Sequence, residues 1–149
     1  MYRGWMDGRR DSTFISRIKM RELKFRAWDS ETDMMYKIVS LNVRRNGTVS
    51  GSIWRKELKG REGRTIQNPP IMQFTGLQDK NGKEIYEGDI VKVWHEGDFE
   101  DKYMKGVVEY STASCGYFID YSKRGVQIMM KKYEEFEVIG NIYENPDLT

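Results

Sequence analysis

The chain has one cysteine, one histidine and three prolines among 149 residues. A single cysteine, Cys115, excludes an internal disulfide and is typical of a protein kept in a reducing cytoplasm. One histidine and one cysteine cannot supply a His/Cys zinc site within one chain. We therefore expect a cytoplasmic protein that holds no metal and no other cofactor.

Long hydrophobic runs are missing as well. No apolar stretch approaches the roughly 18–20 residues needed to span a bilayer, and no signal peptide is visible. The hydrophobic share is low at 38%, but aromatic residues make up 13% of the chain, and each ring buries a large area. A chain of this length can form one domain with its own core, and we expect no membrane contact.

The formal net charge of +2 hides an uneven distribution. Residues 44–64 hold seven basic and two acidic residues, a net charge of +5. Residues 65–149 hold nine basic and fifteen acidic residues, a net charge of −6. Such a division bears on association with partners but does not decide the fold.

Alternation of apolar and polar residues is typical of strands over much of the chain. It would place Leu23, Phe25 and Ala27 on one face of a first strand. Further extended runs are expected at residues 34–43, 48–54, 106–110, 117–121 and 136–139. Residues 126–135 are the only passage compatible with a short helix, and residues 56–70 are the longest irregular segment.

Residues 73–94 organise this pattern as strand, tight turn, short strand, second turn and longer strand. Asn-Gly is the dipeptide that best tolerates a positive φ at both central positions of a type I′ hairpin turn, so Asn81 and Gly82 predict such a turn. Gly88 and Asp89 mark the second turn, where Asp89 would accept local backbone N–H bonds. We predict a mainly β domain built from hairpins, either a curled sheet or a small SH3-like barrel, with at most one short helix.

Candidate catalytic groups are few. Glu84, Glu87 and Asp89 are close in sequence, as the carboxylates of a glycosidase or a metal site would need to be. No matched base, nucleophile or phosphate-binding loop accompanies them. We therefore favour a structural interpretation over a catalytic one: Asp89 would accept backbone N–H bonds within its turn, and the two glutamates would occupy exposed hairpin positions. His95 stands alone at a strand end, and Cys115 has no neighbouring base in sequence. An enzyme is the least favoured class.

The basic segment is the candidate contact surface. Its basic residues flank one tryptophan: Arg44, Arg45, Trp54, Arg55, Lys56, Lys59, Arg61 and Arg64. Such a combination suits single-stranded nucleic acid, whose backbone is anionic and whose bases stack on aromatic rings. The segment could equally be a solvated loop, or could reach the acidic part of another copy of the chain. The residues alone leave these interpretations open.

Residues 1–19 lack the alternation of the rest. We interpret them as an N-terminal extension, flexible or upstream of a natural start at Met20; a basic arm that binds nucleic acid is the alternative. The domain would then cover residues 20–146, with residues 147–149 as a tail.

Three segments resemble one family, in the order in which that family has them. They are MRELKFRAWD at residues 20–29, QFTGLQDKNGKEIYEGDIV at residues 73–91 and VIGNIYENP at residues 138–146. The sequence is thus similar to the YopX family of phage and prophage proteins. The resemblance is weak over residues 44–67 and 99–132.

This resemblance implies a phage-derived cytoplasmic protein that is mainly β and self-associates, and it implies no activity and no catalytic residues. We therefore expect a non-catalytic accessory protein that forms a homo-oligomer or binds a host or phage protein. A nucleic-acid-binding module that uses residues 44–64 is the alternative.

Overall fold

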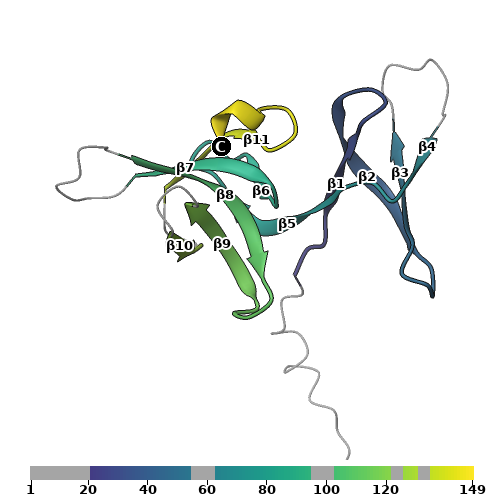
Figure 1. Ribbon diagram of the computed structural model, residues 1–149, viewed down its shortest axis with the longest axis horizontal. Coiled ribbons are helices and arrows are strands. Elements are labelled where there is room, and N and C mark those ends of the chain that lie inside the picture. The colour runs from purple at the N-terminus through teal and green to yellow at the C-terminus, as the bar shows by residue number, and fades with distance from the viewer. Residues whose placement is uncertain (1–20, 55–62, 95–102, 122–125, 131–134) are drawn as a thin grey trace, which may run out of the picture.

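The computed structural model describes residues 21–54, 63–94, 103–121, 126–130 and 135–149. These residues form two antiparallel sheets (Figure 1). The first sheet has the order β4-β3-β2-β1-β5-β6 and the second the order β10-β9-β8-β7-β11. Neither sheet closes into a barrel. The prediction of a mainly β, hairpin-built domain is confirmed, in its form of open sheets.

The six-stranded sheet consists of β1 (Phe25–Asp29), β2 (Met34–Val43), β3 (Val49–Trp54), β4 (Gly63–Gln67), β5 (Ile71–Gln78) and β6 (Glu84–Tyr86). The five-stranded sheet consists of β7 (Asp89–Trp94), β8 (Tyr103–Ser111), β9 (Gly116–Tyr121), β10 (Val126–Met129) and β11 (Phe136–Asn141). A 3-10 helix, Pro146–Leu148, follows β11. No helix in the described part of the chain is long and apolar enough to cross a membrane.

Two expectations about individual segments are wrong. Val126–Met129, in the passage considered for a helix, is strand β10 and pairs with β9, so that Ile128 packs against the core. Residues 131–134 of that passage lie outside the described residues. Gly63–Gln67, in the segment expected to be irregular, is strand β4 and pairs with β3. Cross-strand pairing decides both cases, and periodicity within a short segment does not report it.

Most of the buried apolar residues lie against the five-stranded sheet. The larger core cluster consists of Ile85, Val91, Val93, Val108, Ile119, Tyr121, Met130, Phe136 and Val138. A smaller cluster of Met72, Phe74 and Tyr86 lies on the six-stranded sheet, with Trp28, Met35 and Tyr143 packed against it. β5 and β6 therefore join the two sheets through shared apolar contacts.

The other half of the six-stranded sheet lies outside both core clusters, although Ile53 of β3 is fully buried. The principal contacts of β3 and β4 are with their neighbours in the sheet, and neither core cluster contains a residue from them. Figure 1 shows this half extending away from the five-stranded sheet. Leu23 was expected to share a face with Phe25 and Ala27, but it is 63% exposed while Ala27 is fully buried.

The Asn81-Gly82 turn is not the predicted type I′ turn. Gly82 has a φ of 81°, but Asn81 does not have a positive φ. The Gly82 N–H donates to the Asp79 carbonyl at 2.9 Å, and the Asp79 Oδ1 accepts the N–H groups of Asn81 and Lys83. This is a type I turn followed by a glycine bulge. The Asp79 carboxylate stabilises it, so that only Gly82 needs a positive φ.

Asp79 also ties this turn to the other sheet. Its Oδ2 accepts the N–H of Val138 in β11 at 3.1 Å, and the Lys80 N–H donates to the Phe136 carbonyl at 2.9 Å. Burial by itself would raise the pKa of Asp79, but the backbone donors, led by the Lys83 and Val138 N–H groups, hold that pKa below its ordinary value. The hairpin of one sheet thereby covers the edge of the other.

We expect Asp79→Asn to lower the free energy of unfolding by about 1–3 kcal/mol at pH 7, because an amide nitrogen would face the Val138 N–H while the two turn bonds remain. The pKa of Asp79 is lowered by folding, so its stabilisation is present above the unfolded value of about 3.9 and is lost as the pH falls through the folded pKa. Urea unfolding of both proteins at pH 7 and pH 3 measures this. A difference that does not shrink at pH 3 would contradict the role of the charge.

Gly88 and Gly82 allow the cost of a positive φ to be compared with and without a steric clash. Both have a positive φ, 75° and 81°, but a Cβ on Gly88 would lie 3.3 Å from Ile142 Cδ1, whereas one on Gly82 would meet nothing within 4 Å. We expect Gly82→Ala to cost about 1–2 kcal/mol from the conformation alone, and Gly88→Ala to cost more. Urea unfolding gives both values, and an equal cost would mean that Ile142 moves aside freely.

Candidate functional site

The predicted basic contact surface is only partly within the described residues. Arg44 and Arg45 are exposed at the tip of the β2–β3 hairpin. Trp54 ends β3 and Arg64 lies in β4, but their side chains lie outside the described residues. So do the whole of Arg55, Lys56, Lys59 and Arg61. What this surface contacts stays a prediction.

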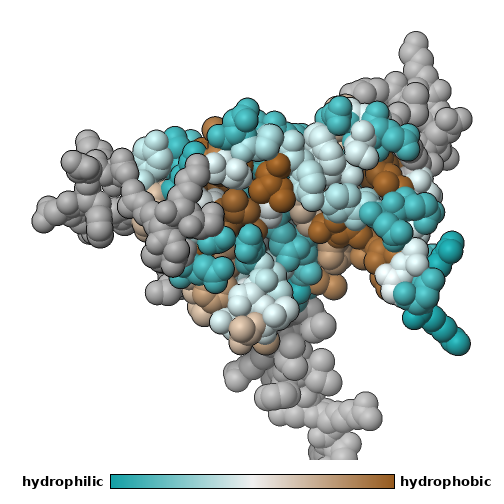
Figure 2. Space-filling view, viewed as in Figure 1, coloured by the Kyte–Doolittle hydropathy of each residue, from teal (hydrophilic) through white to brown (hydrophobic). Residues whose placement is uncertain are grey.

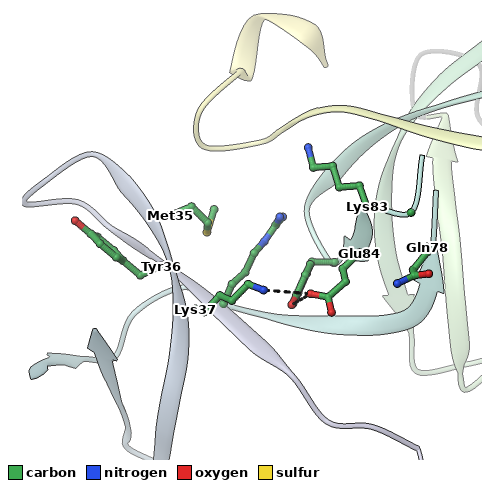
Figure 3. Close-up of a pocket in the computed structure, with 9 residues that line it drawn as sticks. Met35, Tyr36, Lys37, Gln78, Lys83 and Glu84 are labelled. Carbon is green, nitrogen blue, oxygen red and sulfur yellow. Dashed lines mark hydrogen bonds and ion pairs between the residues drawn. The ribbon is translucent and has the colours of Figure 1, made fainter. Parts of the chain in front are cut away.

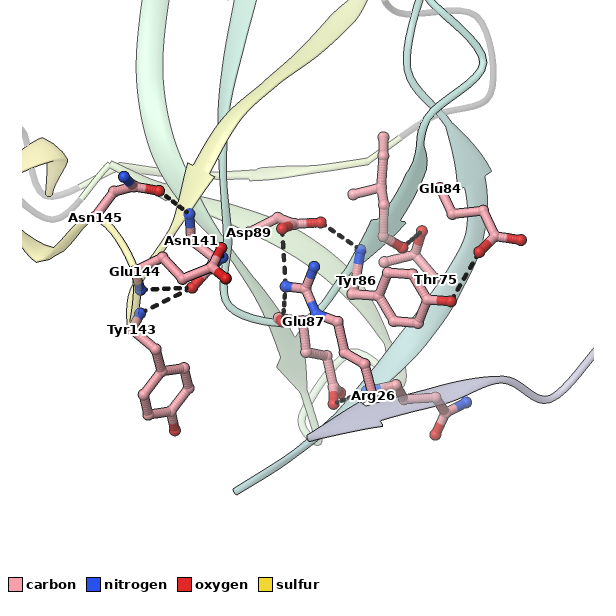
Figure 4. A network of polar contacts seen from close by, with 12 residues as sticks. Arg26, Thr75, Glu84, Tyr86, Glu87, Asp89, Asn141, Tyr143, Glu144 and Asn145 are labelled. Carbon is pink, nitrogen blue, oxygen red and sulfur yellow. Dashed lines mark hydrogen bonds and ion pairs between the residues drawn. The ribbon is translucent and has the colours of Figure 1, made fainter. Parts of the chain in front are cut away.

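A buried ion pair joins the two sheets (Figure 4). Asp89, at the start of β7, is 1% exposed. Its Oδ1 accepts a bond from Arg26 Nη2 in β1 at 2.8 Å, and its Oδ2 accepts the Tyr86 N–H at 2.7 Å. The predicted turn role of Asp89 is confirmed. Its partner Arg26, 63 positions away in the chain, could not be identified from sequence spacing.

The environment of Asp89 is that of a structural carboxylate. Burial raises its pKa, and the Arg26 charge and the Tyr86 N–H oppose that rise. Asp89 lines neither of the two hollows described below. A carboxylate buried in this way is costly unless it is paired, which Arg26 achieves.

The other two carboxylates serve different partners. Glu87 Oε2 accepts the Gln73 N–H at 2.9 Å, and Glu84 accepts bonds from Lys24 Nζ and from the Tyr86 hydroxyl. Both glutamates are partly buried, so the expectation of exposed hairpin positions is wrong. Within the described ranges, no group of three or more His, Cys, Asp or Glu residues could hold a metal ion.

A groove of about 480 Å³ lies between β2 on one side and β6 with the turn that precedes it on the other (Figure 3). Its basic lining residues are Arg26, Lys37 and Lys83, and its acidic one is Glu84. Lys37 Nζ lies 3.6 Å from Glu84 Oε2. Since β1 and β5 separate β2 from β6 in the sheet order, this proximity shows that the sheet curls around the groove.

Glu84 is the electrostatic centre of the groove wall. The bond from Lys24, followed by that from the Tyr86 hydroxyl, holds the pKa of Glu84 below its ordinary value. The same contact raises the pKa of Lys24. Burial, with a contribution from the Glu84 bond, raises the pKa of Tyr86 to about 12. All three groups therefore keep their ordinary charge states at neutral pH.

An apolar strip lies beside the groove. We define it as Leu23, Val39, Leu41 and Val43, which are all exposed. The first three line a hollow of about 320 Å³ that shares Lys37 and Tyr86 with the groove. Figure 2 shows hydrophobic surface where β1 and β2 lie in Figure 1. Sequence alternation could not identify this strip, because it does not say which strand face lacks a covering layer.

The remaining candidates from the sequence do not form a site. Cys115 is exposed, and its Sγ lies 3.5 Å from the Thr112 carbonyl oxygen, within the β8–β9 turn. His95 lies outside the described residues.

Two solved structures are similar to this chain over nearly their whole length. The structure of protein EF1440 from Enterococcus faecalis has a TM-score of 0.61 and 25% identity, covering 87% of this chain and 99% of that one. The structure of protein yopX from Bacillus subtilis has a TM-score of 0.54 and 24% identity, with coverage of 87% and 99%. No curated protein matches the chain. The family model described as "YopX protein" matches residues 24–149, and the chain therefore belongs to the YopX family.

Proposed function

We propose that this chain is a non-catalytic accessory protein, of phage or prophage origin, that associates with further copies of itself. The apolar strip along β2 and just before β1 carries the proposal. A sheet with an apolar face is normally stabilised by a second layer, and β3 and β4 contribute no residue to either core cluster. Exposed apolar residues that line one hollow, as Leu23, Val39 and Leu41 do, typically mark an interaction surface.

A second copy suits this surface because charges of both signs border the strip. Lys24 and Lys37 lie next to Glu22 and Glu84. A twofold interface brings the same patch of two subunits together, so each copy would offer both members of every complementary pair. The division of charge between residues 44–64 and 65–149 supports the same partner, since it favours contact between the basic segment of one copy and the acidic part of another.

The carboxylates support a non-catalytic role. Asp89, Glu87 and Glu84 each bind a different structural partner, through Arg26, the Gln73 N–H and Lys24 respectively. A catalytic pair of carboxylates would instead face one shared space that a substrate can enter.

Binding of single-stranded nucleic acid is the second candidate function. The exposure of Arg44 and Arg45 at one hairpin tip favours it. Binding of this kind weakens steeply as salt rises, because counterions are released from the phosphates. The burial of the apolar strip in self-association does not weaken as salt rises, because it involves no release of counterions.

Val39→Glu/Val43→Glu tests self-association. Both valines are more than half exposed, so we expect the change to alter the stability of one subunit by no more than about 0.5 kcal/mol. Burying two carboxylates against a partner would cost several kcal/mol. In sedimentation velocity at tens of micromolar, we expect the parent to sediment as an oligomer and the variant as a smaller species.

Met129→Glu is the matched control, because Met129 is an exposed apolar residue in β10 of the other sheet. It should sediment like the parent. A parent that is monomeric, or an oligomer unchanged in the double variant, would refute the proposed interface. A monomeric parent that retards single-stranded DNA in a salt-dependent manner would establish the second candidate instead.

A further inference from the structure

The curl of the six-stranded sheet gathers basic side chains on the face that lines the groove. Arg26 and Lys37 are direct partners in the β1–β2 register, so they project from the same face. Lys24, two positions before Arg26, reaches Glu84 on this side. Like charges placed directly opposite each other destabilise a strand pair. Negative charge in the groove would therefore stabilise this cluster of basic side chains.

The protein supplies that negative charge for two of these residues. Asp89 neutralises Arg26 within the interior, and Glu84 binds Lys24 through Oε1 while its Oε2 accepts the Tyr86 hydroxyl. Both oxygens of Glu84 are thus engaged without Lys37.

Lys37 and Lys83 are less fully compensated than Arg26 and Lys24. The Lys37 side chain is 81% exposed and lies 3.6 Å from Glu84, a geometry in which an ion pair contributes little. Lys83 lines the same groove and forms no ion pair with another described residue. Figure 3 shows Lys37 reaching from β2 toward Glu84, and Lys83 extending from the turn before β6.

The remaining lining fits a small molecule. The groove volume of about 480 Å³ falls within the range of about 300–1,000 Å³ that is typical of small-molecule pockets. Met35, on the same face of β2 as Lys37, adds an apolar side, and Gln78 adds an amide. Arg26 Nε is buried and has no hydrogen-bond partner among the described residues, so the guanidinium retains unused donor capacity.

We propose that this groove binds a small organic anion, whose phosphate or carboxylate group lies between Lys37 and Lys83 and whose apolar body packs on Met35. The groove adjoins the hollow along the apolar strip and shares Lys37 and Tyr86 with it, but the proposed ligand contacts no residue of the strip, so the inference goes beyond the proposed self-association. Glu84 limits the affinity, because its carboxylate competes with the ligand for Lys37.

Amide chemical shifts of the full chain, followed by NMR during titration, test the proposal. The probes are phenyl phosphate, benzoate and, as a neutral ring, benzyl alcohol. We expect saturating shifts at Lys37, Lys83 and Glu84 with one or both anions and none with benzyl alcohol. Comparing phenyl phosphate with benzoate shows whether the groove binds a phosphate group or a carboxylate group. No saturation with either anion by about 10 mM, which corresponds to negligible affinity, would overturn the proposal.

Variants separate a specific site from general attraction to lysines. Lys37→Gln and Lys83→Gln should each weaken binding about tenfold, as expected for loss of a charged hydrogen bond, whereas Glu84→Gln should strengthen it. Lys105→Gln, an exposed lysine in β8, should bind like the parent. Equal binding by all four variants would refute the site. Val39→Glu/Val43→Glu should retain binding, so that failure of self-association and failure of the groove remain distinguishable.

Discussion

The arrangement of the two sheets depends on one buried carboxylate and the guanidinium that neutralises it. Arg26 belongs to the six-stranded sheet and Asp89 to the five-stranded sheet, and their bond of 2.8 Å crosses between them. Removing either charge alone would leave the other buried without a partner, which typically costs 3–5 kcal/mol. The sheets therefore pack stably only when β1 lies against the start of β7. Asp79 reinforces this packing from the far end of the β5–β6 hairpin, through Val138.

These ties hold one half of the six-stranded sheet, whereas the other half contributes no residue to either core cluster. β5 and β6 share apolar contacts with the five-stranded sheet, whereas β3 and β4 contact mainly their neighbours. The apolar strip and the charged groove both lie around β2, where the two halves meet. Both proposed interactions thus lie where burial changes along the six-stranded sheet.

Local sequence patterns were sufficient to predict the mainly β fold, most strand positions and the turn role of Asp89. They failed where a distant partner decides the outcome. The Asp79 carboxylate, rather than the Asn81-Gly82 dipeptide, selects the turn type, and pairing with β9 makes a strand of residues that resemble a short helix. Alternation marks two faces of the strand near Leu23 but cannot say which one a second layer will cover. The pairing of Arg26 with Asp89 has no local signal.

A double-mutant cycle on Arg26 and Asp89 tests the central claim most directly. Arg26→Met removes the buried cation, and Asp89→Asn removes the charge while its amide oxygen can still accept the Tyr86 N–H. We expect each single change to lower the free energy of unfolding by about 3–5 kcal/mol, and the double change to cost at least about 2 kcal/mol less than the sum. Urea unfolding at pH 7 measures all four proteins. Costs that add to within about 0.5 kcal/mol would show that the pair does not hold the sheets together.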